Sequence, residues 1–190
     1  MPALGTAHAS PDLGKPESAV GIIGPVEGFT PQIGVLVSMM AFIRVQVLNC
    51  VKGMSVSDLD FLLDPDANTI GATLLHLAAA ESYYQLNTFE GKEWGSWPQA
   101  IKEQWDVPMN LGEPARKTIK GHSVDYYLTT LSSVREKTLL EFRKRDDHWL
   151  AIVDTHWGWN NYAKWFHVAE HESNHNGQFK FLRSRFRQGL

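Results

Sequence analysis

The sequence predicts an all-α protein, a four-helix bundle with a long connection between its second and third helices. Apolar side chains recur at steps of three and four residues in four long stretches, as expected for helices with one buried face. No stretch shows the convincing alternation of a strand, and no internal repeat is present. The 190 residues support one sizeable core, so we expect a Pro- and Gly-rich tail at 1–30 and one bundle domain at 31–190.

The first helix is expected over residues 31–53. Proline and glycine recur too often before Pro31 for a regular helix. From there onward the apolar positions keep a helical period, at Leu36, Met40, Ile43, Val47, Cys50 and Met54. Since Cys50 lies on this apolar face, we expect a buried, unreactive thiol rather than a nucleophile.

The second helix is expected to begin after Asn68 or Thr69, either of which can cap it, and to run as far as Phe89. Within it, Glu81 is expected to pair or cap inside the bundle. The stretch 92–121 is rich in Gly and Pro, and we expect at most one short helix in it, near 98–106. Connections of that length are usually lids or covers over a core opening.

Two further helices complete the expected bundle. The third is predicted from the N-cap Ser123 to about Lys144. The fourth is predicted from Asn160 or Asn161 to about Arg187. The short linkers before the second and fourth helices favour antiparallel neighbours.

Charge and hydropathy exclude several classes of partner. Eighteen basic and twenty-one acidic side chains give a formal net charge of -3, so we expect no nucleic-acid partner. No apolar run approaches the ~18 to 20 residues of a membrane span, and the first residues lack the features of a signal peptide. We therefore expect no membrane partner and a cytoplasmic location, with which a single cysteine agrees.

The histidines carry the chemistry that the sequence offers. His167, His171 and His175 follow one another at one-turn steps and therefore share one stripe of the fourth helix. His76 lies in the second helix among Leu and Ala, where a lone imidazole needs a partner. A metal is such a partner, because two imidazoles from one helix and a third from a facing helix form an open three-nitrogen site.

Spacing alone leaves two ligand pairs open on the fourth helix. Both His167 with His171 and His171 with His175 are one turn apart. We favour the second pair because Gly177, costly inside a helix, indicates a crowded site or close packing beside it. The alternative to a metal site is a hydrogen-bonded core histidine at position 76 and helix-surface histidines elsewhere. Four tryptophans, expected mainly as packing residues, also suit the wall of an apolar pocket above the open metal positions: Trp94, Trp97, Trp157 and Trp159.

Two segments resemble the DinB-like superfamily of four-helix-bundle proteins. Residues 68–81 resemble its second helix, with a single histidine followed by a glutamate, and residues 166–178 resemble its fourth. The order and spacing of the helices over 31–187 agree. The superfamily includes DinB proteins, YfiT-type proteins classed as metal-dependent hydrolases, and thiol-dependent transferases, so the resemblance implies a helical bundle with a metal site.

The resemblance implies that His76, His171 and His175 hold a divalent metal ion, for which imidazole suits zinc, nickel or iron. It also implies small-molecule chemistry, and homodimers are common among such proteins. We expect transfer of a low-molecular-weight thiol to an electrophilic small molecule, with a metal-dependent hydrolase and a non-catalytic stress-related or ligand-binding bundle as alternatives. Three nearby residues are candidates for supporting the metal ligands or contacting substrate: Gln178, His167 and Glu172. For Glu172 a solvated position on the helix is the alternative interpretation.

Overall fold

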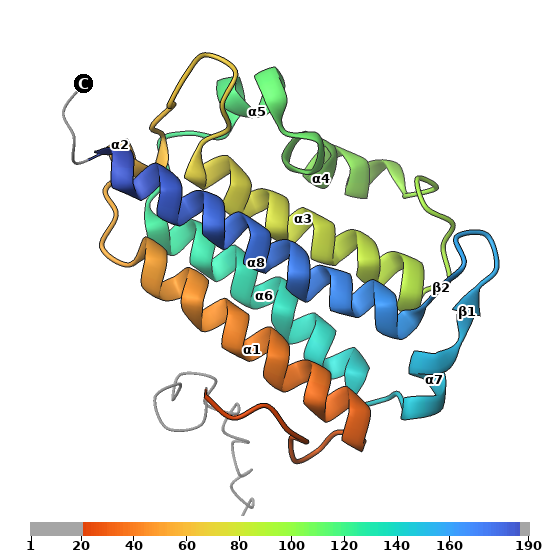
Figure 1. The fold of residues 1–190 in the computed structure, drawn as a ribbon. Helices are drawn as coiled ribbons and strands as arrows, with labels where there is room; N and C mark the ends of the chain where they lie inside the picture. Colours follow the sequence, from red (N-terminus) through yellow and green to blue (C-terminus); the bar gives the residue numbers. More distant parts are fainter. Residues whose placement is uncertain (1–20, 187–190) are drawn as a thin grey trace, which may run out of the picture.

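The computed structural model describes residues 21–186 and contains the bundle that the sequence predicts (Figure 1). Its long helices are α1 (Pro31–Val51), α3 (Ile70–Phe89), α6 (Val124–Phe142) and α8 (Asn161–Phe186). The all-α prediction is confirmed, and the helical periods locate each of the four helices to within a few residues. Residues 1–20 of the expected tail and the predicted helix end at Arg187 lie outside the described residues.

Short elements connect the long helices. Helix α2 (Val56–Leu59) lies between α1 and α3, and helix α7 (Asp147–Ala151) lies between α6 and α8. A small antiparallel hairpin follows α7, with β1 (Val153–Asp154) paired to β2 (Trp159–Asn160). Strands of two residues are too short to show an alternating pattern, which explains why the sequence pattern does not reveal them.

The long connection between α3 and α6 is more regular than expected. It holds two helices, α4 (Gln99–Asn110) and α5 (Gly112–Thr118), so the prediction of at most one short helix near 98–106 is wrong. Helix α4 continues for two residues past Pro108, although a proline disfavours the helix, because burial of Trp105 and Pro108 holds it on the bundle. Figure 1 shows α4 lying along one side of α3, where it can cover a site.

Side-chain caps fix where two of the long helices begin. The Oγ1 of Thr69 accepts a hydrogen bond from the backbone N–H of Ala72, which makes Thr69 the N-cap of α3. The Oδ1 of Asn160 accepts from the N–H of Ala163 at the start of α8. Strand β2 therefore leads directly into α8 and ties the hairpin to this helix.

Two apolar clusters form the core. One gathers around α3, α6 and the α4–α5 segment, and the other fills the end of the bundle beside α7. Cys50 is buried as predicted, and burial raises the pKa of its thiol. Helices α3 and α6 approach closely at Gly71, where an added Cβ would lie 2.6 Å from the Oη of Tyr127.

Four buried charged side chains, here called the charged quartet, lie between the long helices, one from each: Arg44, Glu81, Arg135 and Glu172. Arg135 donates to Glu81 over 2.8 Å and to Glu172 over 3.0 Å. Arg44 donates to the same two carboxylates from the other side. Every member is at most 9% exposed, and each charge has two opposite charges beside it.

Helix α1 is long and apolar enough to cross a membrane by length and composition alone. This finding differs from the expectation that no apolar run approaches that length. In the structure α1 packs along α8, and Arg44 near its middle is bonded within the charged quartet. Burial in a bundle accounts for the apolar character of this helix.

The charged quartet gives a first prediction, on stability. Burial opposes ionisation of Glu81, but Arg135, Arg44 and the hydroxyl of Thr138 outweigh it, so the pKa of Glu81 lies below its usual 4.5. Replacing Glu81 by Gln leaves two buried arginines with one carboxylate, and we expect a loss of about 3 to 5 kcal/mol in the free energy of unfolding. Denaturant titration at neutral pH measures this loss.

The control is Glu141→Gln, which removes a surface carboxylate paired with Lys144 and is expected to cost less than about 1 kcal/mol. The pH dependence gives a second readout. Because folding lowers the pKa of Glu81, its stabilisation is complete above 4.5 and is lost as the pH falls toward the folded-state pKa. The Glu81→Gln variant should therefore lose less stability than the wild type between pH 5 and 3. Equal losses in both carboxylate variants at neutral pH contradict the prediction.

Candidate metal centre

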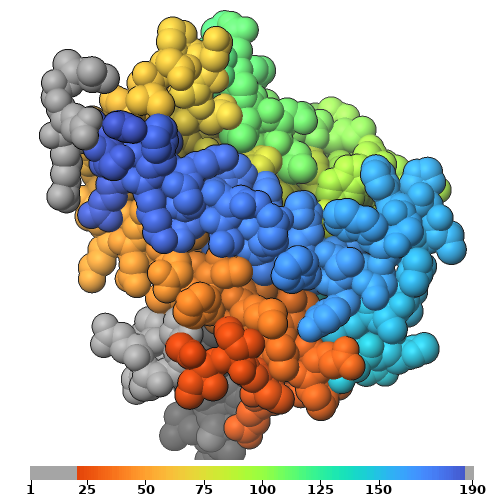
Figure 2. All heavy atoms as spheres, viewed as in Figure 1, coloured from red at the N-terminus to blue at the C-terminus, as the bar shows by residue number. Residues whose placement is uncertain are grey.

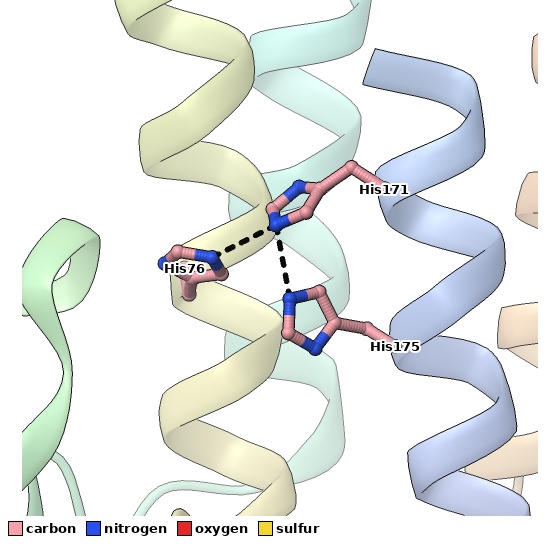
Figure 3. A group of neighbouring side chains, drawn as sticks. All are labelled: His76, His171 and His175. Carbon is pink, nitrogen blue, oxygen red and sulfur yellow. Dashed lines mark hydrogen bonds between the residues drawn. The ribbon is translucent and has the colours of Figure 1, made fainter. Parts of the chain in front are cut away.

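Three histidines from two helices meet on one side of the bundle. His76 lies in the first half of α3, and His171 and His175 lie one turn apart on α8 (Figure 3). His76 is 9% exposed, whereas the other two are half-buried. Because α3 and α8 pack against each other, residues 95 positions apart in the sequence share this site.

The Nε2 atoms of the three imidazoles converge. The Nε2 of His171 lies 3.1 Å from that of His76 and 3.0 Å from that of His175. Figure 3 shows the three side chains pointing toward one another between α3 and α8, and the rings of His76 and His175 are each T-shaped to the ring of His171. Two nitrogens that each lie about 2.0 to 2.1 Å from a tetrahedral ion are about 3.3 Å apart, so the observed spacing is close to that of metal ligands.

In His76 and in His175, a carbonyl oxygen determines which ring nitrogen carries the proton. The Nδ1 of His76 donates to the backbone oxygen of Met109 over 2.9 Å and lies 3.2 Å from that of Pro108. The Nδ1 of His175 donates to the Oε1 of Gln178 over 2.8 Å. These oxygens only accept, so the Nε2 atoms of both histidines present lone pairs toward His171.

This arrangement fits a cation. The single N–H that His171 can place at Nε2 would serve only one of the two lone pairs that face it, whereas a metal ion satisfies all three nitrogens. Burial and the neighbouring histidines lower the pKa of His171 to about 3. Burial also lowers the pKa values of His76 and His175. All three imidazoles are therefore neutral at physiological pH, as metal ligands must be.

The contacts of His76 with the backbone of Pro108 and Met109 could not be predicted from side-chain patterns. Pro108 and Met109 belong to the last turn of α4, whose final carbonyls have no partner within the helix. They accept the proton of His76 because α4 lies along α3. No residue type marks a backbone acceptor, so only the position of α4 reveals it.

The structure brings together His171 and His175, the pair that we favoured, and leaves His167 outside. The ring of His167 lies 5.7 Å from that of His171, and its Nδ1 is 3.1 Å from the carboxylate of Glu170. The argument from Gly177 was wrong, however, because an added Cβ there would meet open space.

Gln178 and Glu172, the other two candidates for supporting the ligands, lie in different surroundings. Gln178 contacts His175 as described above. Glu172 neither supports an imidazole nor lies in solvent, so both interpretations of it were wrong. It is 2% exposed and bonded to Arg44 and Arg135, since its position on α8 faces the centre of the bundle. Sequence could not show this, because its partners are 128 and 37 residues away.

Three of the four expected tryptophans line one apolar cavity, at the end of α3 beside the hairpin. These are Trp94, Trp157 and Trp159. Trp97 is instead buried and packs against Tyr83. The cavity lies on the far side of His167 from the three-histidine cluster, because the ring of His167 is 5.7 Å from both His171 and Trp159.

Comparison with known families agrees with the site. The family model described as Mycothiol-S-transferase matches residues 35–188, from within α1 to two residues past Phe186, the last residue of α8. The chain belongs to the mycothiol S-transferase family. This family is part of the DinB-like superfamily, so the resemblance inferred from sequence is confirmed. Mycothiol S-transferases carry out metal-dependent transfer of mycothiol to electrophiles. Comparison with curated proteins finds no match.

Metal content tests the cluster. We expect near one divalent ion per chain in protein purified without a metal-affinity tag, and loss of that ion in His76→Ala and in His171→Ala, because either change leaves two ligands. Elemental analysis measures it. The control is His167→Ala, which should keep its metal. Little metal in the wild type, even after incubation with zinc, nickel or iron, would contradict a metal site.

The support from Gln178 gives a separate prediction. Replacing Gln178 by Ala frees the ring of His175, and we expect metal affinity to fall by about 10- to 100-fold, since oriented ligands bind more tightly. Competition with a chromogenic chelator measures the affinity. Asn174→Ala, on the same helix and bonded to Glu170 instead, should leave it unchanged. Equal affinities of the wild type and Gln178→Ala refute the supporting role.

Proposed function

We propose that this chain transfers mycothiol to an electrophilic small molecule at a divalent metal ion held by His76, His171 and His175. The observation that carries the proposal is the convergence of three Nε2 atoms in a member of the mycothiol S-transferase family. The proposal includes zinc, nickel or iron as the ion, because neutral imidazoles suit all three. It also includes the cytoplasm as the location, because the reaction consumes a reduced thiol.

The ligand set suits thiol activation. A divalent ion at this site supplies a positive charge that lowers the pKa of a bound thiol and favours the thiolate near neutral pH. Three neutral imidazoles add no negative charge that would offset this effect. Met109 and Gln178 keep the lone pairs of His76 and His175 directed at one point, so little rearrangement is needed.

The transfer itself balances without a further cofactor. The sulfur of mycothiol forms a bond to the electrophilic carbon as the bond from that carbon to the leaving group breaks. The leaving group keeps the electron pair of the broken bond, and the thiol proton passes to water. Helix α4 covers His76 and keeps water from that side of the site, which limits competing hydrolysis.

Hydrolysis has less support. A water nucleophile needs a group that accepts its proton, which is commonly a carboxylate near the metal. Within residues 21–186, the group of close ligand atoms at this site consists of the three histidines and includes no carboxylate. A thiol ionises more readily than water, so transfer needs no such base.

Conjugate formation tests the proposal. Mycothiol and chloroacetone are mixed with the metal-loaded protein, and the S-conjugate is followed by mass spectrometry after subtraction of the uncatalysed rate. We expect His171→Ala to lower kcat/KM by at least about 100-fold, equivalent to about 2.7 kcal/mol, because the ion is lost. A chelator should abolish transfer, and added metal should restore it. Phe181→Ala, an exposed aromatic on α8 outside the site, is the control. Wild-type rates equal to the uncatalysed rate overturn the proposed function.

A further inference from the structure

A cavity of about 260 Å³ lies beyond His167 from the metal centre and is lined by three segments of the chain. Helix α3, the segment that follows it and the hairpin with the start of α8 contribute Tyr84, Asn87, Trp94, Trp157, Trp159 and Lys164. Figure 2 shows the yellow-green atoms that follow α3 meeting the light-blue atoms of the hairpin at one edge of the molecule. The volume lies just below the usual range for ligand pockets, so it suits one group of a ligand rather than a whole large molecule.

The walls of the cavity are aromatic and partly exposed. Trp157 is 56% exposed, Trp159 is 44% exposed and Trp94 is 38% exposed. The rings of Trp94 and Tyr84 pack 5.1 Å apart, so one wall is already ordered. Exposed tryptophans gathered around one opening indicate a binding surface, since their burial by a ligand is favourable.

The polar groups of the cavity are mostly engaged with one another. The ammonium of Lys164 donates to the Oδ1 of Asn87 over 2.7 Å and to the Oδ2 of Asp154 over 2.6 Å. The amide of Asn87 donates in turn to the backbone oxygen of Lys92. Because an ammonium has three donors, Lys164 has one N–H left for a ligand. Aromatic walls with one donor match a flat ring that bears an acceptor oxygen.

Helix α8 contributes residues to both the cavity and the metal centre. Lys164 precedes His171 by seven residues, which is about 10.5 Å along the axis of α8. The ring of His167 lies between the two, 6.0 Å from Tyr84 and 5.7 Å from His171. An elongated molecule can therefore place one end in the cavity and the other at the three histidines.

We propose that this cavity binds the aromatic part of the electrophile, a planar fused-ring group with an acceptor oxygen at the end away from the reacting carbon. The inference rests on the proposed function for the reaction at the other end of the molecule. Trp94, Trp157 and Trp159 hold the ring, and Lys164 donates to the oxygen. The substrates of the site are then aryl electrophiles in preference to small aliphatic ones.

Binding is tested with 2-acetyl-6-methoxynaphthalene, an unreactive fluorescent ketone of this shape. We expect its emission to move to shorter wavelength when it is titrated with the full-length wild-type protein, with or without metal. Trp157→Ala and Trp94→Ala, on separate segments, should each weaken the Kd about tenfold, and Phe181→Ala should leave it unchanged. Equal Kd values in the wild type and both tryptophan variants overturn the inference. Displacement of the ketone by myo-inositol or methyl glucoside also overturns it, in favour of the polyol part of mycothiol.

Kinetics separate this inference from the proposed function. Two electrophiles with the same reacting group are compared, chloroacetone and 2-(chloroacetyl)-6-methoxynaphthalene. We expect Trp157→Ala to raise KM for the naphthyl compound about tenfold and to leave KM for chloroacetone unchanged. Transfer to chloroacetone without any preference for the naphthyl compound refutes the aromatic site and leaves the proposed function standing. Ketone binding without transfer to either compound refutes the proposed function and supports the aromatic site.

Discussion

A closed ring of alternating buried charges holds the four long helices in one register. Each helix supplies one charge, so a rotation of any helix would leave an unpaired ion in the core. The consequence reaches the metal centre, because Glu172 directly follows His171 on α8 and Glu81 lies on the same helix as His76. The rotation that pairs the carboxylates is also the one that directs the imidazoles of α3 and α8 to the same point.

The segments outside the bundle supply what the four helices lack. Helix α4 provides the carbonyl oxygens that set the proton of His76, and the hairpin before α8 provides two walls of the aromatic cavity. The bundle thus acts as a scaffold for the ligands, while the connections shape their surroundings. This division matches a superfamily in which one bundle supports several chemistries, since connections change more freely than packed helices.

Sequence was sufficient where the signal is local. Helical periods revealed the bundle, and two histidines one turn apart with a third in an apolar helix indicated the cluster. It was insufficient where the partner is distant or is backbone. In the sequence Glu172 resembles a surface residue, and only the structure shows Arg135 beside it. The identity of residue 109 likewise does not show that its carbonyl faces a histidine. Helix α4 was underestimated because Pro108 normally ends a helix, and tertiary packing overrode that preference.

The Nδ1–H of His76 donates to main-chain oxygen and not to a side chain. Every amino acid has the same carbonyl, so residues 108 and 109 can change identity while the contact persists. Selection would then act on the path of α4 rather than on its side chains at these positions. Relatives are expected to differ freely in sequence here and still keep the same histidine tautomer, whereas the contact of His175 depends on one particular amide.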